Sequence, residues 1–226
     1  MSNQTEEMPL TEAQIERRAL VAEKHAQAKT LLRQQGIDCW LTFSREGSDL
    51  LLPYGMVGEY LGGQAALMVF ADGPTVAIVA DYDIGQVEGE FDIIHAYHGD
   101  WKEPFVETLK ERNPATIAAN YSEGDFGVDG LTHGLWLKLT GVLESLGMAD
   151  RLRSAESITT LVRALKTPNE IERIRRACEV TQRIFEDVTG ILRPGLSEMD
   201  VHEFMVERMQ TYGVAPSWEA AYCPAV

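Results

Sequence analysis

The sequence predicts an α/β fold, a layered domain with a mixed sheet followed by a mainly helical second region. Two observations predict it. Short apolar runs typical of strands alternate with helical patterns between residues 11 and 157. After residue 158 the pattern changes to two long helical runs. We therefore expect two domains, over residues 1–160 and 161–226.

The first domain begins with a predicted helix over 11–35. Thr11 is a suitable N-cap, and Gly36 suits the left-handed residue that ends a helix. After this helix, short β-rich runs alternate with helical runs, and this alternation favours a mostly parallel sheet. Further helical segments are expected over 45–55, 81–88, 102–112 and 131–147, and strands over 38–43, 91–97, 116–121 and 151–157.

A hairpin is expected over 65–80. Two apolar runs are joined there by Ala-Asp-Gly-Pro at 71–74, which is turn chemistry. The sheet is therefore predicted to be mixed, with one antiparallel hairpin among parallel strands.

The second region begins with a well-marked helix. Thr167 and Glu170 have the spacing of a capping box, and Pro168 suits the first helical position. Apolar residues recur at helical spacing after it, at Ile171, Ile174, Cys178, Ile184, Phe185 and Val188. Cys178 lies on this stripe, so we expect it to be a small core residue, as we do for Cys39 on a predicted buried strand.

A second helix of this region is expected after Ser197, which forms an S-x-x-D capping box with Asp200. Residues 216–222 resemble a strand, and the sequence ends at Val226. Because a strand needs partners for its backbone groups, we expect this domain to be cut short.

Composition and charge limit the classes of partner. The net charge is −15 and the sequence pI is about 4.7, which disfavours binding to nucleic acid or to an anionic membrane. The N-terminus is not of secretory type, and no run of about 18 apolar residues predicts a membrane span. Cys39, Cys178 and Cys223 form neither a disulfide framework nor a CxxC motif. A cytoplasmic location is expected.

Two motifs about 25 residues apart point to a known family. "KTPNEI" (166–171), preceded by Arg163, and "RPGLSE" (193–198) resemble the start of the catalytic domain in the Xaa-Pro aminopeptidase, prolidase and creatinase family. The order of elements over 11–226 agrees with that family. The resemblance implies a creatinase/prolidase-type (ribonuclease-H-like) N-terminal domain, followed by the start of an α+β pita-bread domain.

The resemblance also implies a dinuclear site of divalent metal (Mn, Co or Zn). Two Asp, one His and two Glu would hold the ions, and a metal-bound hydroxide would attack the substrate. The family motifs for these ligands come after the position of Val226, so no catalytic or metal-binding residue is assigned in this chain. The resemblance implies a small peptide or amide substrate and a homodimer for the intact protein. The chain by itself is expected to be inactive, with its N-terminal part shaping the substrate entrance and the dimer contact.

Three aromatic residues in predicted loops are candidates for lining a substrate pocket, namely Tyr54, Tyr60 and Trp101. Ordinary packing is the alternative. At residues 52–55 the chain has Leu-Pro-Tyr-Gly where the family often has Tyr-Leu-Thr-Gly.

His95, His98 and Asp100 lie close together in sequence, at the end of a predicted strand. A metal site there would require a turn that brings them together, because His95 and His98 point to opposite faces of a strand. An ordinary strand-end loop is the favoured reading.

Two other functions remain open. One is a non-catalytic interaction module of the same architecture, and the other is a creatinase-like hydrolase or lyase acting on a small metabolite. Sequence beyond Val226 would separate them, because the five metal ligands in family order indicate a peptidase-type enzyme.

Overall fold

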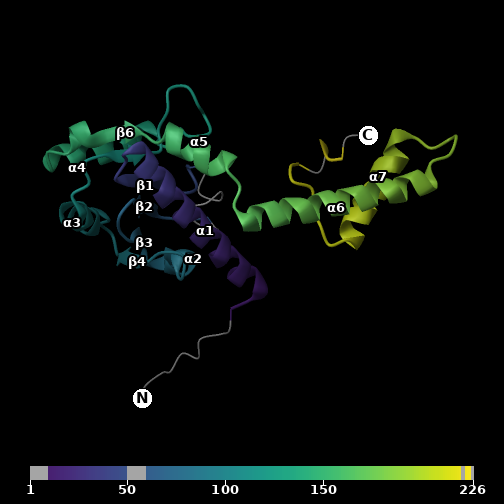
Figure 1. Ribbon diagram of the computed structural model, residues 1–226, viewed down its shortest axis with the longest axis horizontal. Helices are drawn as coiled ribbons and strands as arrows, with labels where there is room; N and C mark the ends of the chain where they lie inside the picture. Colours follow the sequence, from purple (N-terminus) through teal and green to yellow (C-terminus); the bar gives the residue numbers. More distant parts are fainter. Residues whose placement is uncertain (1–9, 50–59, 220–221, 225–226) are drawn as a thin grey trace, which may run out of the picture. The chain divides into compact units, whose positions relative to one another are not determined.

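The computed structural model describes residues 10–49, 60–219 and 222–224, and the chain divides into two compact units (Figure 1). The first unit is Met1–Thr167 and the second is Pro168–Val226. The boundary expected between residues 160 and 161 falls inside a helix of the first unit. No helix within the described ranges has both the length and the apolar character needed to cross a membrane.

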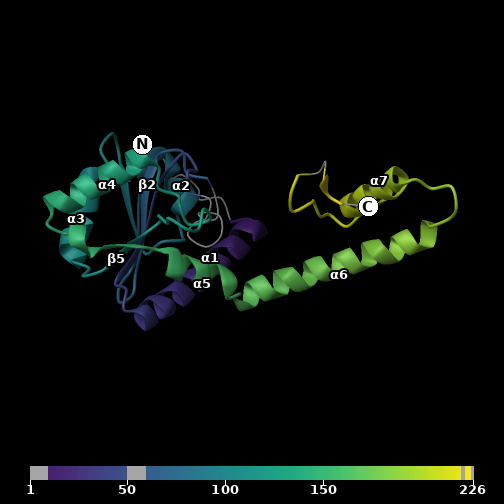
Figure 2. The same ribbon diagram turned by 90° about the horizontal axis from the view of Figure 1, so that it is seen from above.

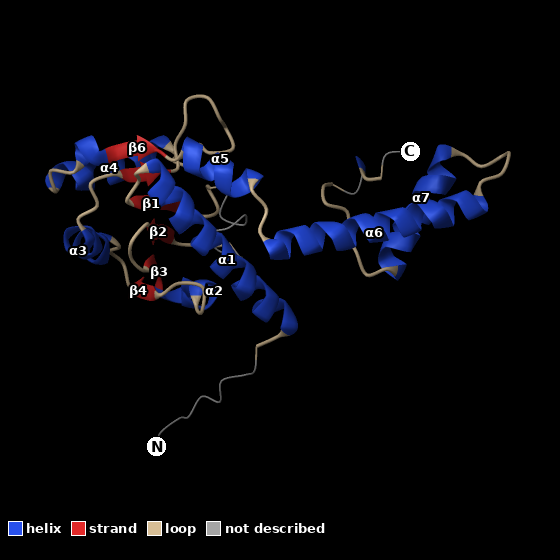
Figure 3. Cartoon of the chain, in the orientation of Figure 1, coloured by secondary structure: helices blue, strands red, loops and turns tan. Residues whose placement is uncertain are grey.

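The first unit is built on a six-stranded mixed sheet with the order β4-β3-β2-β1-β5-β6 (Figure 3). β2 is antiparallel to β1 and β3, and the other neighbouring pairs are parallel. The predicted mixed sheet with one hairpin is therefore confirmed. The strands are β1 (Cys39–Arg45), β2 (Gln64–Phe70), β3 (Thr75–Ala80), β4 (Ile93–Tyr97), β5 (Ile117–Ala119) and β6 (Leu152–Ser154).

Helices cover both faces of this sheet, which gives a layered α/β/α arrangement (Figure 2). α1 and α5 share a core with one face, and α3 and α4 share a core with the other. Within the described residues, the helices of this unit are α1 (Glu12–Gln35), α2 (Ile84–Val87), α3 (Lys102–Arg112), α4 (His133–Ser145) and α5 (Glu156–Ala164), with short 3-10 turns at Asp81–Asp83 and Ala149–Arg151.

The central strands are apolar on both sides because both sides are covered. Along β2, Leu67 and Val69 belong to the core beneath α1 and α5, whereas Met68 and Phe70 belong to the core beneath α3 and α4. Successive side chains of a strand point to opposite faces, so an unbroken apolar run is what a two-sided core requires.

The caps predicted for the first helix are confirmed. The Thr11 hydroxyl accepts a hydrogen bond from the backbone N–H of Gln14, and the Gln14 side-chain oxygen accepts one from the Thr11 N–H. Gly36 follows the helix with φ 65°, a left-handed conformation that glycine adopts without strain. These caps fix where α1 begins and where it ends.

Helix α5 was not predicted, and it packs beside α1. Its contact with α1 is anchored by Lys24, which is only 1% exposed. The Lys24 ammonium donates to the carbonyls of Val162 at 2.6 Å and Leu165 at 3.1 Å, at the carboxyl end of α5. A cation in this position satisfies carbonyls that have no partner within the helix and opposes the helix dipole.

The second unit contains α6 (Pro168–Ile191) and α7 (Glu198–Thr211), as the sequence predicted. The capping box of Ser197 and Asp200 is confirmed. Ile184 and Val188 of α6 pack with Met205 of α7 in a small core.

The strand expected over 216–222 is wrong. Residues 216–219 and 222–224 form bends and a 3-10 turn, and Trp218 Nε1 donates to the Tyr222 carbonyl at 3.1 Å. These residues resemble a strand in sequence, but the described part of the second unit contains no strand that could form backbone hydrogen bonds with them.

Candidate functional site

The carboxyl ends of five strands meet at one edge of the sheet, because β2 alone runs in the opposite direction. In open α/β sheets, ligands bind beyond the carboxyl ends of the strands. Polar side chains gather at this edge, and we call them the carboxyl-edge site. Its described members are Asp49, Gln64, Asp81, Asp83, Tyr97, His98, Asn120 and Lys138.

Asn120 follows β5 and ties it to β1. Its Oδ1 accepts from the Phe43 N–H at 3.0 Å, and its Nδ2 donates to the Phe43 carbonyl at 3.2 Å and to the Asp49 carboxylate. Asn120 and Asp49 are 1% and 3% exposed. A Cβ at Gly130 would lie 2.5 Å from Asp49 Oδ2, so only glycine leaves room for this carboxylate. The network holds the segment after β1 against β5.

Asp83 organises the start of β2. Its two carboxylate oxygens accept from the backbone N–H of Gly62 at 3.1 Å and of Gly63 at 2.7 Å. The carboxylate is buried and uses both oxygens for the chain's own backbone. Its visible role is therefore to position this segment.

Gln64, the first residue of β2, joins three elements. Its carbonyl accepts from the Tyr97 hydroxyl at 2.7 Å, and its Oε1 accepts from Lys138 Nζ of α4 at 3.1 Å. Burial raises the pKa of Tyr97, so the phenol stays protonated as a donor. Gln64 Nε2 is buried and has no acceptor within the part of the chain that the structure describes.

Asp81 and His98 form an exposed pair at the ends of β3 and β4. His98 Nδ1 lies 2.8 Å from Asp81 Oδ2. The hydrogen bond to Asp81 raises the pKa of His98, and the same bond lowers the pKa of Asp81. The stability that protonated His98 contributes through this pair is fully present below its unfolded-state pKa of about 6.5. This contribution is lost as pH rises through the higher folded-state pKa.

An NMR titration tests this pair. We expect the pKa of His98 to lie above its ordinary value of about 6.5, and the Asp81→Asn substitution to lower it toward that value. Asp150→Asn, at an exposed residue of a distant turn, should leave it unchanged. An identical His98 pKa in the wild type and the Asp81→Asn variant would show that the pair does not form.

The three predicted substrate-lining residues differ in where the structure places them. Tyr54 lies outside the described residues, and Tyr60 is 62% exposed. Trp101 is buried beside Phe43 and Phe105, with ring centroids 4.9 Å and 5.5 Å away. It precedes α3 directly, and its ring turns into the core rather than toward solvent. A substrate-lining role stays a prediction for all three.

His98 and Asp100, which lie close together in sequence, have separate hydrogen-bond partners in the structure. His98 bonds Asp81 rather than Asp100, and Asp100 Oδ1 accepts from the Lys102 N–H at 2.9 Å. Among residues 10–49, 60–219 and 222–224, no group of three or more His, Cys, Asp and Glu side chains is positioned to hold a metal ion.

The second unit has an apolar pocket of about 460 Å³ within its own elements. α6, α7 and the segment after α7 line it, with Ile184, Phe185, Met205, Met209 and Trp218 among the lining side chains. This pocket offers few polar groups to direct chemistry, so its character is that of a packing or docking surface.

The expectation for Cys178 is wrong. Cys178 is exposed, as are Ile171 and Ile174 on the same side of α6. The apolar stripe is wider than the part that α7 covers, and only Ile184 and Val188 of the predicted stripe are buried. Cys39 is buried as expected, and burial strongly raises the pKa of its thiol.

The fold is similar to about half of the chain in solved X-Pro aminopeptidase and prolidase structures, which confirms the resemblance seen in the sequence at the level of fold. Neither the comparison with protein families nor that with curated proteins finds a match.

Among similar solved structures is the X-Pro aminopeptidase of Thermotoga maritima, with a TM-score of 0.56 and 18% identity over 84% of this chain and 49% of that one. The dipeptidase PepE of Mycobacterium ulcerans gives 0.55 and 18% over 86% and 50%. The prolidase of Thermococcus sibiricus gives 0.55 and 16% over 87% and 51%. The chain thus spans about half the length of the structures it matches.

Proposed function

We propose that this chain is the N-terminal portion of a metal-dependent Xaa-Pro peptidase-like hydrolase of the aminopeptidase P or prolidase type. Its first unit would shape the substrate entrance and contribute to a homodimer contact. The second unit would be the beginning of the catalytic domain. The substrate would be a small peptide, and the location cytoplasmic.

One observation carries this proposal. The structural match covers 84–87% of the chain, a share larger than the first unit alone provides. The similarity therefore extends from the layered unit into the second unit, which begins at Pro168. A match that continues across both units of this chain supports a common design for the whole protein.

The residues described in this chain do not fit the dinuclear metal site that the fold implies. That site needs several carboxylates and a histidine around two ions. The histidine and the carboxylates of the carboxyl-edge site are already engaged: Asp83 accepts from backbone N–H groups, Asp49 accepts from the Asn120 side chain, and Asp81 pairs with His98. We therefore assign no catalytic step to these residues.

A calorimetric titration with Mn²⁺, Co²⁺ and Zn²⁺ tests this assignment. The proposal predicts no stoichiometric binding of two ions by the 226-residue chain, because a strong site requires convergent ligands. As a control, Asp81→Asn should leave the titration unchanged, since Asp81 is already paired with His98. Tight binding of two ions would contradict the proposed division between this chain and its catalytic site.

A further inference from the structure

Helix α5 ends at a point where side chains, rather than a glycine turn, satisfy its last carbonyls. The four carbonyls at the end of a helix have no N–H partner within it, and here they belong to residues 162–165. Leu165 follows the helix with φ −83°, so it does not form the left-handed turn that commonly caps a helix. Instead, each of the four carbonyls accepts a hydrogen bond from a lysine or glutamine side chain.

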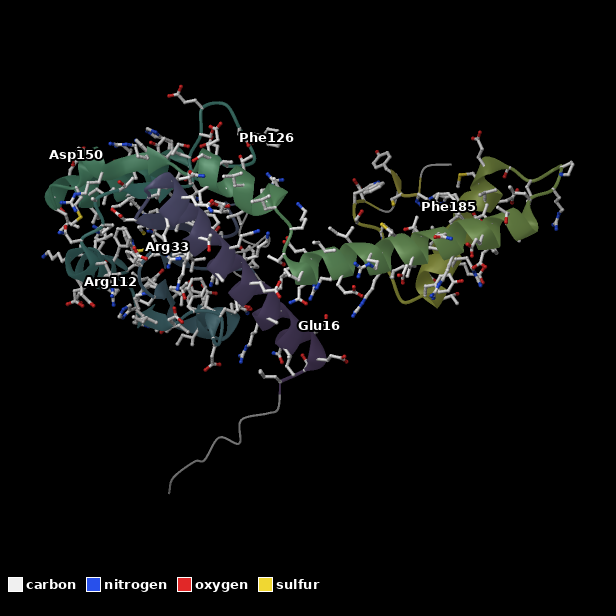
Figure 4. All side chains as sticks on the ribbon, in the orientation of Figure 1. Glu16, Arg33, Arg112, Phe126, Asp150 and Phe185 are labelled. Carbon is white, nitrogen blue, oxygen red and sulfur yellow. The ribbon has the colours of Figure 1, made fainter. Side chains whose placement is uncertain are left out.

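Two of these donors, Lys24 and Gln27, lie on α1, and we call them the α1 clamp. They come from the middle of α1, between the labelled Glu16 and Arg33 (Figure 4). Besides the carbonyls of α5, Lys24 Nζ donates to Gln27 Oε1 at 3.1 Å. Because an ammonium accepts no hydrogen bond, the Gln27 oxygen must face Lys24 and its Nε2 must face the other way. Gln27 Nε2 donates to the Leu165 carbonyl at 3.0 Å, so this carbonyl accepts from both members of the clamp.

The α1 clamp lies where the chain leaves the first unit. Only residues 165–167 connect α5 to α6, and they belong to the first unit. Lys166 Nζ donates back to the Arg163 carbonyl and, at 3.4 Å, to the Ala164 carbonyl. Pro168, the first residue of α6, has no N–H, so its backbone cannot extend the hydrogen bonding of α5. The connection is therefore short, and it is tied to α1 and α5 at its start.

We propose that the α1 clamp makes residues 165–167 a fixed exit from the first unit rather than a flexible tether, and that Gln27 controls the opening of this exit. Lys24 is 1% exposed, and unwinding the last turn of α5 would leave its ammonium buried without the two carbonyls of α5. Burying a charge without partners is costly, so the clamp opposes this opening. The inference goes beyond the proposed function and rests on contacts within the first unit, so its test needs neither metal nor peptide.

Native-state hydrogen exchange of the full 226-residue chain, followed by NMR, tests the clamp. The Leu165 amide reports on the last turn of α5, because it donates to the Leu161 carbonyl at 2.9 Å. Gln27→Leu removes the donor to Leu165 and should raise the exchange rate of this amide about fivefold, the effect of one net hydrogen bond on a local opening. The Thr159 amide, near the other end of α5, should exchange at an unchanged rate. Low concentrations of urea should not alter the Leu165 rate, since a local opening exposes little surface.

Gln34→Leu is the matched control, because it makes the same substitution at an exposed residue of α1. It should leave the exchange of the Leu165 amide unchanged. Gln27→Glu separates the two contacts of Gln27, because a carboxylate still accepts from Lys24 but cannot donate to Leu165, and it should also raise the exchange rate. A Leu165 rate that either Gln27 variant leaves unchanged overturns the proposal. So does a Leu165 amide that exchanges in the wild type as fast as in an unstructured peptide, since the exit would then be a flexible tether.

Discussion

Asn120→Asp is expected to lower the free energy of unfolding by about 3–5 kcal/mol at neutral pH. The substitution replaces the amide group that donates to the Phe43 carbonyl and to the Asp49 carboxylate. It places a second carboxylate against Asp49 in a site that is almost fully buried. Urea unfolding followed by tryptophan fluorescence measures the loss, because Trp40 and Trp101 lie in the two cores of the first unit.

The effect of Asn120→Asp should also depend on pH in a defined direction. Two adjacent buried carboxylates share a proton, so the pKa of the pair in the folded variant rises above the unfolded value of about 3.9. The free energy of unfolding of the variant should therefore increase as pH falls. It should decrease as pH rises from the unfolded-state pKa through the higher folded-state pKa of the pair. Asn113→Asp makes the same change at an exposed residue and should cost less than about 0.5 kcal/mol. A loss below about 1 kcal/mol for Asn120→Asp would show that the network does not hold β1 to β5.

Lys24→Met is expected to lower the free energy of unfolding by about 2–4 kcal/mol. Methionine keeps the apolar stem but removes the ammonium that donates to Val162 and Leu165. The Val162 carbonyl then loses the donor that satisfies it at the buried end of α5. The same urea experiment measures this loss.

Lys110→Met is the control for Lys24→Met, because Lys110 is exposed on α3. It makes the same change of charge and should alter stability by less than about 0.5 kcal/mol. Equal effects of the two substitutions would mean that Lys24 acts through the net charge of the protein and not through the carbonyls of α5.

The elements that the sequence predicted correctly are those with local signals. Thr11 and Gly36 mark the ends of α1, and Ser197 with Asp200 marks the start of α7. The turn at 71–74 separates two apolar runs that pair as a hairpin. In each case the residues that specify the structure lie next to it in the chain.

Helix α5 had no such signal, because tertiary packing decides its structure. Ile158, Thr159 and Val162 are β-branched, and such residues favour strands. In the structure all three are buried on the inner side of a helix that contacts α1. Burial against the sheet outweighs the small cost of these residues in a helix.

The carboxyl-edge site was missed because its members come from separate parts of the sequence. Asp49 and Asn120 are 71 positions apart, and each is a polar residue following a strand. That position at the end of a parallel strand is the signal that would have found them. No sequence signal indicates that Lys24 is buried, because a lysine on an amphipathic helix normally lies on the exposed side. Cys178 shows the opposite error, because an apolar stripe does not reveal which part of it is covered.

Hydrolysis of Xaa-Pro dipeptides by the purified chain, with Mn²⁺ or Co²⁺ present, tests the central claim most directly. The claim proposed above is that this chain has the fold of about half of an Xaa-Pro peptidase and that its described residues do not form the catalytic centre. The account predicts no turnover above a blank that contains metal and dipeptide without protein. Metal-dependent turnover that EDTA abolishes would contradict it.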